Sequence, residues 1–241
     1  MKIRAVIFDV YGTLLQVGPP PTDADARWRS LFRDAFHAEP KLSRLEFAVA
    51  CNHLIAQRHA SAHARGISFP EICWPSVVAA VLPEFARLAA GAQEEFLFQH
   101  IQTGRTTHLH AGAAEALRWL AGNHCALGIA SNAQAYSLRE LAEGLGSAGL
   151  DLSAFERELC FWSYQHGFSK PDPHVFQILL TRLEARGIGP AETLMVGDRL
   201  DNDVEPAQAQ GFQRWWLSES PSSTGLAGDW KKLSEWLRRN A

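Results

Sequence analysis

The apolar positions of the sequence follow two rhythms along most of the chain. Short unbroken apolar runs, many of them β-branched, each end in a polar residue or a turn. Such runs are typical of strands buried on both faces of a parallel sheet. They predict strands at 3–10, 125–131, 159–164, 193–198 and 214–218. Between them, apolar residues three and four apart predict helices at 111–121, 134–145, 173–186 and 203–210, with a last surface helix at 229–239 after a polar loop at 218–228.

Alternation of strands with helices favours an α/β fold, in which a Rossmann-like, doubly wound parallel sheet is covered by helices on both faces. In such sheets, ligands bind beyond the carboxyl ends of the strands. The polar residues that directly follow the predicted strands are therefore the first candidates for function.

The alternation stops after the first strand. Gly18 and three prolines are followed by some eighty residues with helical periodicity, clearest at 28–36 and 45–60, and by no convincing strand. We therefore expect two domains: an α/β core from 1–15 and 107–241, and an inserted all-helical domain over 16–106. The polar run at 103–107 is the expected hinge.

Composition narrows the class of partner. The 241 residues are 46% hydrophobic, enough for a sizeable core, and their net charge is −3 with acids and bases intermingled. We expect a small-molecule substrate, no nucleic acid and no membrane, because no apolar stretch approaches the length of a membrane span. The cysteines lack the spacing of a disulfide framework or a zinc site, and we expect the protein to be cytoplasmic. The sequence does not decide between a monomer and a homodimer.

The strand ends present a coherent set of polar side chains. One acid after a strand can simply cap the next helix. A nucleophilic carboxylate, hydroxyl and amide groups, a fixed cation and a pair of metal-binding acids together are what a phosphoryl group needs for attack and charge neutralisation. The set comprises Asp9, Ser131, Asn132, Lys170, Asp198 and Asp203, with Asp201 and Asn202 beside them.

Four segments carry a resemblance to a known family. DVYGTL from Asp9, IASN ending at Asn132, SKPDP around Lys170 and VGDRLDNDV around Asp198 resemble, in this order, the motifs of the haloacid dehalogenase-like (HAD) hydrolases. The helical insertion is similar to the cap domain that many members carry after the first motif. The resemblance implies that Asp9 attacks the substrate and forms a covalent aspartyl intermediate.

The resemblance also implies roles for the neighbours of Asp9. Thr13 and Ser131, together with Asn132, would bind the transferring group, and Lys170 would neutralise it. The implied cofactor is Mg²⁺, held by Asp9, Asp198 and the backbone carbonyl of Tyr11, with Asp203 supporting the metal or Lys170. Tyr11 and Gly12 are expected to contact the substrate, as is Arg29 in a basic and aromatic cluster at 27–33, because an arginine can grip a carboxylate or phosphate with two hydrogen bonds.

One departure from the family pattern leaves alternatives open. Phosphatases of the family usually have a second Asp two residues after the nucleophile as general acid and base, and this chain has Tyr11. Losing such assistance costs roughly 10²- to 10⁴-fold in rate. An enzyme without it is expected to prefer substrates whose leaving group needs no proton, such as acyl or aryl phosphates.

The family's 2-haloacid dehalogenases share the DxYGT pattern and expel halide without protonating it. They do without metal, have small neutral residues in place of the Gly-Asp of the fourth motif, and carry a Tyr six residues after the third-motif Lys. This chain has Asp198 and Phe176 at those places. We therefore expect a Mg²⁺-dependent phosphatase of a small phosphorylated metabolite, with a metal-free 2-haloacid dehalogenase and a catalytically weak binding or regulatory protein as alternatives.

Overall fold

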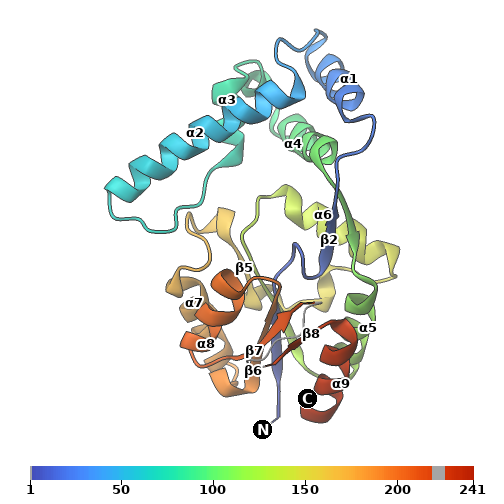
Figure 1. The fold of residues 1–241 in the computed structure, drawn as a ribbon, viewed down its shortest axis with the longest axis vertical. Coiled ribbons are helices and arrows are strands. Elements are labelled where there is room, and N and C mark those ends of the chain that lie inside the picture. Colours follow the sequence, from blue (N-terminus) through green and yellow to red (C-terminus); the bar gives the residue numbers. More distant parts are fainter. Residues whose placement is uncertain (1, 219–225) are drawn as a thin grey trace.

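The computed structural model describes residues 2–218 and 226–241, and its centre is a six-stranded sheet. The strand order is β5-β4-β1-β6-β7-β8, and every neighbouring pair is parallel. The strands are β1 (Ala5–Phe8), β4 (Ala126–Ser131), β5 (Cys160–Trp162), β6 (Thr193–Gly197), β7 (Gln213–Leu217) and β8 (Ala227–Gly228). The carboxyl ends of β1, β4, β5 and β6 thus lie at one edge of the sheet, below the helices at the top of Figure 1.

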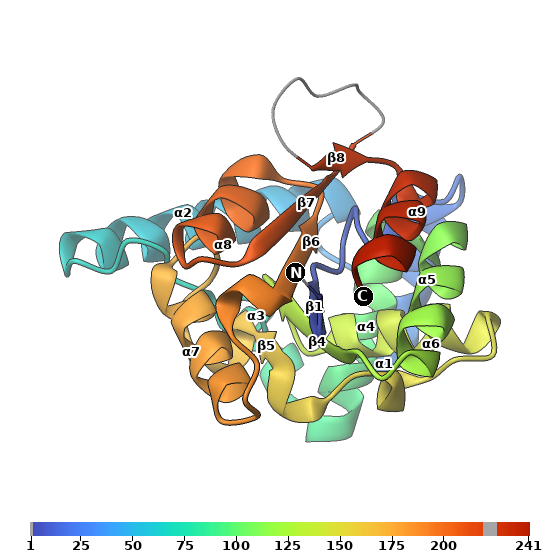
Figure 2. The same cartoon turned by 90° about the horizontal axis from the view of Figure 1, so that it is seen from below.

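Helices cover both faces of this sheet, as Figure 2 shows. Alternate residues of β1 enter different clusters: Val6 and Phe8 pack on one side, and Ala5 and Ile7 on the other. A strand with apolar side chains on both faces must be buried on both, which explains its unbroken apolar run. One face is covered by α5 (Ala111–Gly122), α6 (Tyr136–Ser147) and α9 (Trp230–Asn240), and the other by α7 (Pro173–Glu184) and α8 (Glu205–Ala209).

The predicted α/β fold class is confirmed, and all five predicted strands are present within a few residues of their expected limits. The predicted helix at 203–210 instead begins as a wide helical turn, Leu200–Val204, before α8. Of the predicted polar loop at 218–228, residues 219–225 lie outside the described residues, and the end of the segment forms β8. Two residues are too few to leave an apolar rhythm in the sequence.

Four helices between residues 24 and 104, here called the helical unit, lie beyond the strand ends (Figure 1). The helices are α1 (Ala24–Phe36), α2 (Arg44–Ala64), α3 (Trp74–Val81) and α4 (Ala90–Gly104). They have an aromatic core of their own, in which Trp28 stacks on Phe47 and meets Phe32 and Phe96 edge to face. Ser43 begins α2 with a capping box that includes Glu46, which fixes where the longest helix starts.

Two short strands connect the helical unit to the sheet. β2 (Leu15–Gly18) pairs antiparallel with β3 (Thr106–Leu109), so that both chain crossings form one ribbon. This ribbon was not predicted, because its four-residue strands are partly exposed and mixed in polarity. The expected domain boundaries near 16 and 106 fall within it, and the division into two domains stays a prediction.

The helical unit also contacts the sheet region at a second place, away from the ribbon. The Glu71 backbone N–H donates to the carbonyl of Gly167 at 3.0 Å, and the Ser169 N–H donates to the carbonyl of Phe69 at 3.0 Å. Residues 69–71 therefore lie directly beside the loop that leads to Lys170. Among the described helices, none has both the length and the apolar character that a membrane span needs.

Candidate active site

The end of β1 and the tight turn after it place Asp9 at the edge of the sheet. The Asp9 N–H donates to the Val196 carbonyl of β6 at 2.9 Å, so the residue is still held by the sheet. The chain then folds back on itself, because the Leu15 N–H donates to the Val10 carbonyl at 2.7 Å. Gly12 has a φ of 79° within this turn, a left-handed conformation that glycine adopts without steric cost. Asp9 remains 8% exposed, so one edge of its carboxylate can meet a ligand.

Lys170 lies between two of the acids. Its Nζ donates to Asp9 Oδ1 at 2.7 Å and to Asp203 Oδ1 at 2.5 Å, and all three side chains are buried. Asn132 fixes the lysine's backbone from the end of β4: its Nδ2 donates to the Lys170 carbonyl at 2.9 Å, and its Oδ1 accepts from the Lys170 N–H at 2.7 Å. The structure therefore brings four of the predicted residues together and gives Asn132 a positioning role.

Asp198 completes a group of three acids. Carboxylate oxygens of Asp9, Asp198 and Asp203 lie within 4.8 Å of one another. A Cβ on Gly12 would stand 2.2 Å from Asp198 Oδ2, so the backbone beside Tyr11 lies directly against this carboxylate. Carboxylate and carbonyl oxygens at this spacing are the donors that a hard divalent cation takes, and the residues present therefore fit Mg²⁺.

The electrostatics of the acids agree with this donor set. Burial raises the pKa of Asp9 to about 7; Lys170 lowers it, but Asp203 and Asp198 raise it further. Burial and the Asp203 charge also raise the pKa of Asp198. Burial alone would lower the pKa of Lys170, but Asp9 and Asp203 outweigh it and the pKa is raised. Three carboxylates thus share one ammonium, which leaves an excess of negative charge that a bound cation would neutralise.

Two buried hydroxyls lie in the same motifs. Thr13 and Ser131 are fully buried, and their hydroxyl oxygens have no hydrogen-bond partner among the described residues. Buried polar groups in folded proteins are normally paired, and an unpaired one costs free energy. Thr13 lies in the turn after Asp9, and Ser131 is the last residue of β4, directly before Asn132. Their hydroxyls are thus available to a bound anion, which is the role that the sequence predicted for them.

A buried hydrogen-bond network, which the sequence did not predict, occupies the Tyr11 hydroxyl, so this group is not free to act as a general acid or base. The hydroxyl donates to Glu140 Oε2 at 2.5 Å, and the Arg105 guanidinium lies 4.2 Å from the centre of the Tyr11 ring. Arg105 also forms an ion pair with Glu140 at 2.5 Å, and Gln102 Nε2 donates to Glu140 Oε1 at 3.0 Å. Burial raises the pKa of Tyr11 well above its usual range; Arg105 opposes this shift and Glu140 adds to it.

One signal in the sequence could have revealed this network. Glu140 lies next to Leu141 on the predicted helix 134–145, and it is 2% exposed in the structure. An acid on the buried face of a helix requires a partner. Arg105 lies in the predicted hinge run, far away in sequence, so only the fold could identify it as that partner.

Arg29 is the one predicted site residue that the structure does not bring to the strand ends. It lies exposed on α1, whereas the neighbouring Trp28 is 1% exposed in the core of the helical unit. Successive helical residues point about 100° apart, and on α1 this turn directs Arg29 away from the core that buries Trp28. The helix buries the aromatic residue and leaves the charged one in water.

Comparison with known proteins agrees with this geometry. The family model described as haloacid dehalogenase-like hydrolase matches residues 3–211. No curated protein sequence matches the chain.

Several solved structures share the fold over nearly the whole chain. They include a 2-haloacid dehalogenase from Pseudomonas syringae (21% identity, 99% of this chain and 100% of that one, TM-score 0.63). The magnesium-bound HAD-hydrolase YfnB from Bacillus subtilis has 23% identity, 98% and 99% coverage and a TM-score of 0.55. A HAD phosphatase from Thermococcus onnurineus has 20% identity, 98% coverage of both chains and a TM-score of 0.54.

Proposed function

Because the chain belongs to the haloacid dehalogenase-like hydrolases, we propose that it is a Mg²⁺-dependent phosphatase that acts through an aspartyl-phosphate on Asp9. The observation that carries the proposal is the group of three acids, Asp9, Asp198 and Asp203, around a single lysine. This arrangement has an excess of negative charge beside the nucleophile. A dehalogenase site without metal would have to keep that charge next to the group that attacks.

The first step is displacement at phosphorus. Lys170 holds Asp9 Oδ1, so the second oxygen of Asp9 attacks. An O–P bond forms to Asp9, the ester O–P bond breaks, and the leaving group departs with the electron pair. The hydroxyls of Thr13 and Ser131 donate to phosphoryl oxygens, and Lys170 neutralises their charge. When bound, Mg²⁺ would supply further positive charge at the transferring group.

The second step returns the enzyme to its starting state. Water attacks phosphorus and gives a proton to a base, the bond to Asp9 breaks, and inorganic phosphate is released; the base then loses the proton to solvent. Tyr11 is not available as base, because its pKa is raised and its hydroxyl is bound to Glu140. Asp203, bound to Lys170, is the proposed base. Because no acid lies beside the leaving group, we expect acyl and aryl phosphates to be the favoured substrates. The proposed location of the enzyme is the cytoplasm.

A 2-haloacid dehalogenase is the second candidate, and the Tyr11 network is the observation that favours it. Displacement of halide by a carboxylate needs no proton donor, so the absence of an acid at Tyr11 would cost nothing. Dehalogenases are also among the solved structures of the same fold. A likeness at 21% identity shows the fold alone, and the charge around Asp198 weighs against a metal-free site.

Paired assays with and without Mg²⁺ separate these activities. Phosphate release is measured from 4-nitrophenyl phosphate and acetyl phosphate, and halide release from 2-chloropropionate. Asp9→Asn tests the nucleophile, and Asp151→Asn, an exposed acid outside the site, is the matched control. Mg²⁺-dependent phosphate release that only Asp9→Asn abolishes supports the phosphatase. Halide release that survives a chelator overturns it in favour of the dehalogenase. Silence in every assay, with orthovanadate still raising the melting temperature, overturns it in favour of a binding protein.

A further inference from the structure

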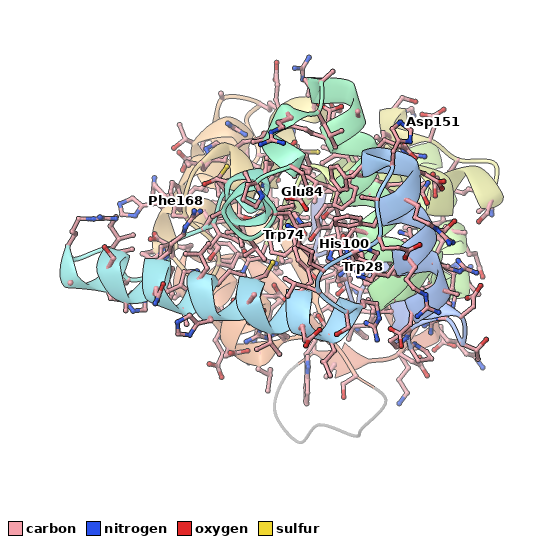
Figure 3. All side chains as sticks on the ribbon, turned by 90° about the horizontal axis from the view of Figure 1, so that it is seen from above. Trp28, Trp74, Glu84, His100, Asp151 and Phe168 are labelled. Carbon is pink, nitrogen blue, oxygen red and sulfur yellow. The ribbon has the colours of Figure 1, made fainter. Side chains whose placement is uncertain are left out.

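The segment between α2 and α3 reaches from the helical unit to the sheet region. In Figure 1 the chain leaves the far end of α2, descends toward the sheet region and returns to α3. Pro70 pairs with Phe168 in an isolated antiparallel bridge, and the Trp74 N–H donates to Gln134 Oε1 at 3.3 Å. Phe168 and Trp74, both labelled in Figure 3, thus mark the two ends of this contact. Residues 70–74 are called the contact segment here.

Glu71 lies at the centre of the contact segment. Its Oε1 accepts from the Ile72 N–H at 2.8 Å and from Gln134 Nε2 at 3.0 Å, and its Oε2 accepts from the Ser163 hydroxyl. All three donors are uncharged. A hydrogen bond to an ionised carboxylate is roughly twice as strong as one between neutral groups, so the charge of Glu71 strengthens each of these bonds.

Ser163 connects Glu71 to the turn that follows β4. Its side chain is fully buried, and its oxygen accepts from the Ala133 N–H at 2.8 Å. A hydroxyl has a single proton, which Ser163 can donate either to Glu71 or to the Ala133 carbonyl at 3.2 Å. The carboxylate is the stronger acceptor. Glu71 therefore fixes the direction of the Ser163 proton and leaves a lone pair of the oxygen for the Ala133 N–H.

The turn bonded to Ser163 carries two residues of the candidate active site. Ser131 ends β4 with a buried hydroxyl that has no partner among the described residues, and Asn132 binds the Lys170 main chain at two points. Ala133 follows directly. The loop 167–169, which leads to Lys170, is bonded to residues 69–71 through the backbone. This part of the helical unit thus contacts both loops that hold the anion-binding groups in place.

We propose that Glu71 is a positioning residue: through Ser163 it holds the turn 131–134 in the geometry that a phosphoryl group requires. The inference rests on the proposed phosphatase and names a residue of the helical unit on which its site depends. Glu71 acts on the turn and does not contact the reacting atoms. A carboxylate suits this role because its two oxygens accept from three donors at once, whereas an amide has one acceptor oxygen.

The first test follows the Ala133 amide in the full-length protein and needs no turnover. Amide hydrogen exchange, measured by NMR, is expected to be about two- to tenfold faster at Ala133 in Glu71→Ala than in the wild-type protein, which is the value of one net hydrogen bond. Glu71→Gln keeps the length of the side chain and one acceptor, and its exchange should fall between the two. Glu94→Ala, which removes an exposed acid of α4, is the matched control and should leave the exchange unchanged.

The second test asks whether Glu71 acts through Ser163. Phosphate release from 4-nitrophenyl phosphate and acetyl phosphate is measured for Glu71→Ala, Ser163→Ala and the double variant. Each single variant is expected to lose about tenfold in kcat, by the same factor with both substrates, because the turn serves the phosphoryl group that they share. KM should change less than kcat. The double variant should lose no more than Ser163→Ala alone, whereas losses that multiply would overturn the action through Ser163.

Failure of this inference and failure of the proposed function give different results. Unchanged exchange at Ala133 in Glu71→Ala overturns the positioning role, whatever reaction the protein catalyses. Faster exchange throughout the chain, with a lower midpoint of urea denaturation, also overturns it, because Glu71 would then act on global stability. Faster exchange confined to the turn, in a protein that releases no phosphate in any assay, supports the action of Glu71 on the turn and refutes the phosphatase.

Discussion

The strand-end site and the pocket lined by α2, α4 and the start of α6 differ in the charge of their side chains. At the strand ends, Lys170 is bonded to Asp9 and Asp203, and three acids compete for its charge. In the pocket, the lining has no Lys, Arg, Asp or Glu, and burial, with the charge of Arg44, lowers the pKa of His100 to about 4. The first region concentrates charged groups around the Asp9 carboxylate, whereas the side chains that line the second carry no charge.

The two regions also differ in how they relate to the reacting groups. The strand-end groups are fixed by backbone contacts, such as those between Asn132 and the Lys170 main chain, and they would act on any phosphoryl group. The pocket between α2, α4 and the start of α6 is formed by helix faces and lies apart from these groups, since neither Asp9 nor Lys170 lines it. Substitutions at the strand ends should therefore change activity directly, and substitutions on the α2 and α4 walls of the pocket should leave the strand-end geometry intact.

The largest effect is expected from removing the ammonium group of Lys170, which Asp9 and Asp203 share. Lys170→Met leaves Asp9 and Asp203 buried without a partner, and breaking a buried ion pair in this way costs about 3 to 5 kcal/mol. Urea denaturation at pH 7 measures the loss, which should shrink at pH 5 because Asp9, whose pKa burial raises to about 7, takes up a proton. Lys231→Met, on the exposed side of α9, is the control. A loss below about 1 kcal/mol would contradict the view that charge holds this region together.

The stability of the helical unit should respond to pH through His100 on α4. Its pKa is about 4 in the fold and 6.5 in the unfolded chain, so the unfolded chain binds the extra proton between these values. Stability is then complete above pH 6.5 and falls by about 3 kcal/mol as the pH drops to 4. His100→Phe should lack this contribution. The measurement is the unfolding free energy at both pH values for each protein; equal changes in the two would show that His100 does not titrate as described.

A methyl group added at Gly12, beside the Asp198 carboxylate, tests the strand-end site sterically without changing its charge. Gly12→Ala would put a methyl group 2.2 Å from Asp198 Oδ2, and displacement of a catalytic group by about 1 Å costs about 100-fold in rate. Gly66→Ala is matched, since Gly66 has a φ of 84° and no atom within 4 Å of the added Cβ. Both variants should lose similar stability from backbone strain, but only Gly12→Ala should lose kcat/KM and Mg²⁺ affinity. Equal activities would contradict the crowding.

The smallest effect is expected at Tyr11. Tyr11→Phe removes one donor to Glu140, which still accepts from Arg105 and Gln102, so the loss of stability should be about 1 kcal/mol. Activity should stay within about tenfold, with an unchanged pH profile. Tyr164→Phe is the control, because that hydroxyl accepts only a surface bond from Gln165. A decrease of 10² to 10⁴ would instead identify Tyr11 as a general acid or base.

The sheet and much of the strand-end site could be predicted from the sequence. Unbroken apolar runs such as 5–8 require burial on both faces, and parallel strands bring their carboxyl ends to one edge, which places Asp9 and Asp198 together. These are consequences of local pattern and general topology, and neither depends on the details of side-chain packing.

Which distant side chains meet depends on the folded packing. It pairs Glu140 with Arg105, leaves Arg29 in solvent, joins the short strands β2 and β3, and stacks Trp74 on His100. Each outcome depends on how helix faces pack against one another, and amphipathic periodicity shows that a face is buried without showing against what. The hydrolase family was therefore readable from the chain, whereas the contacts that would select a substrate exist only after folding.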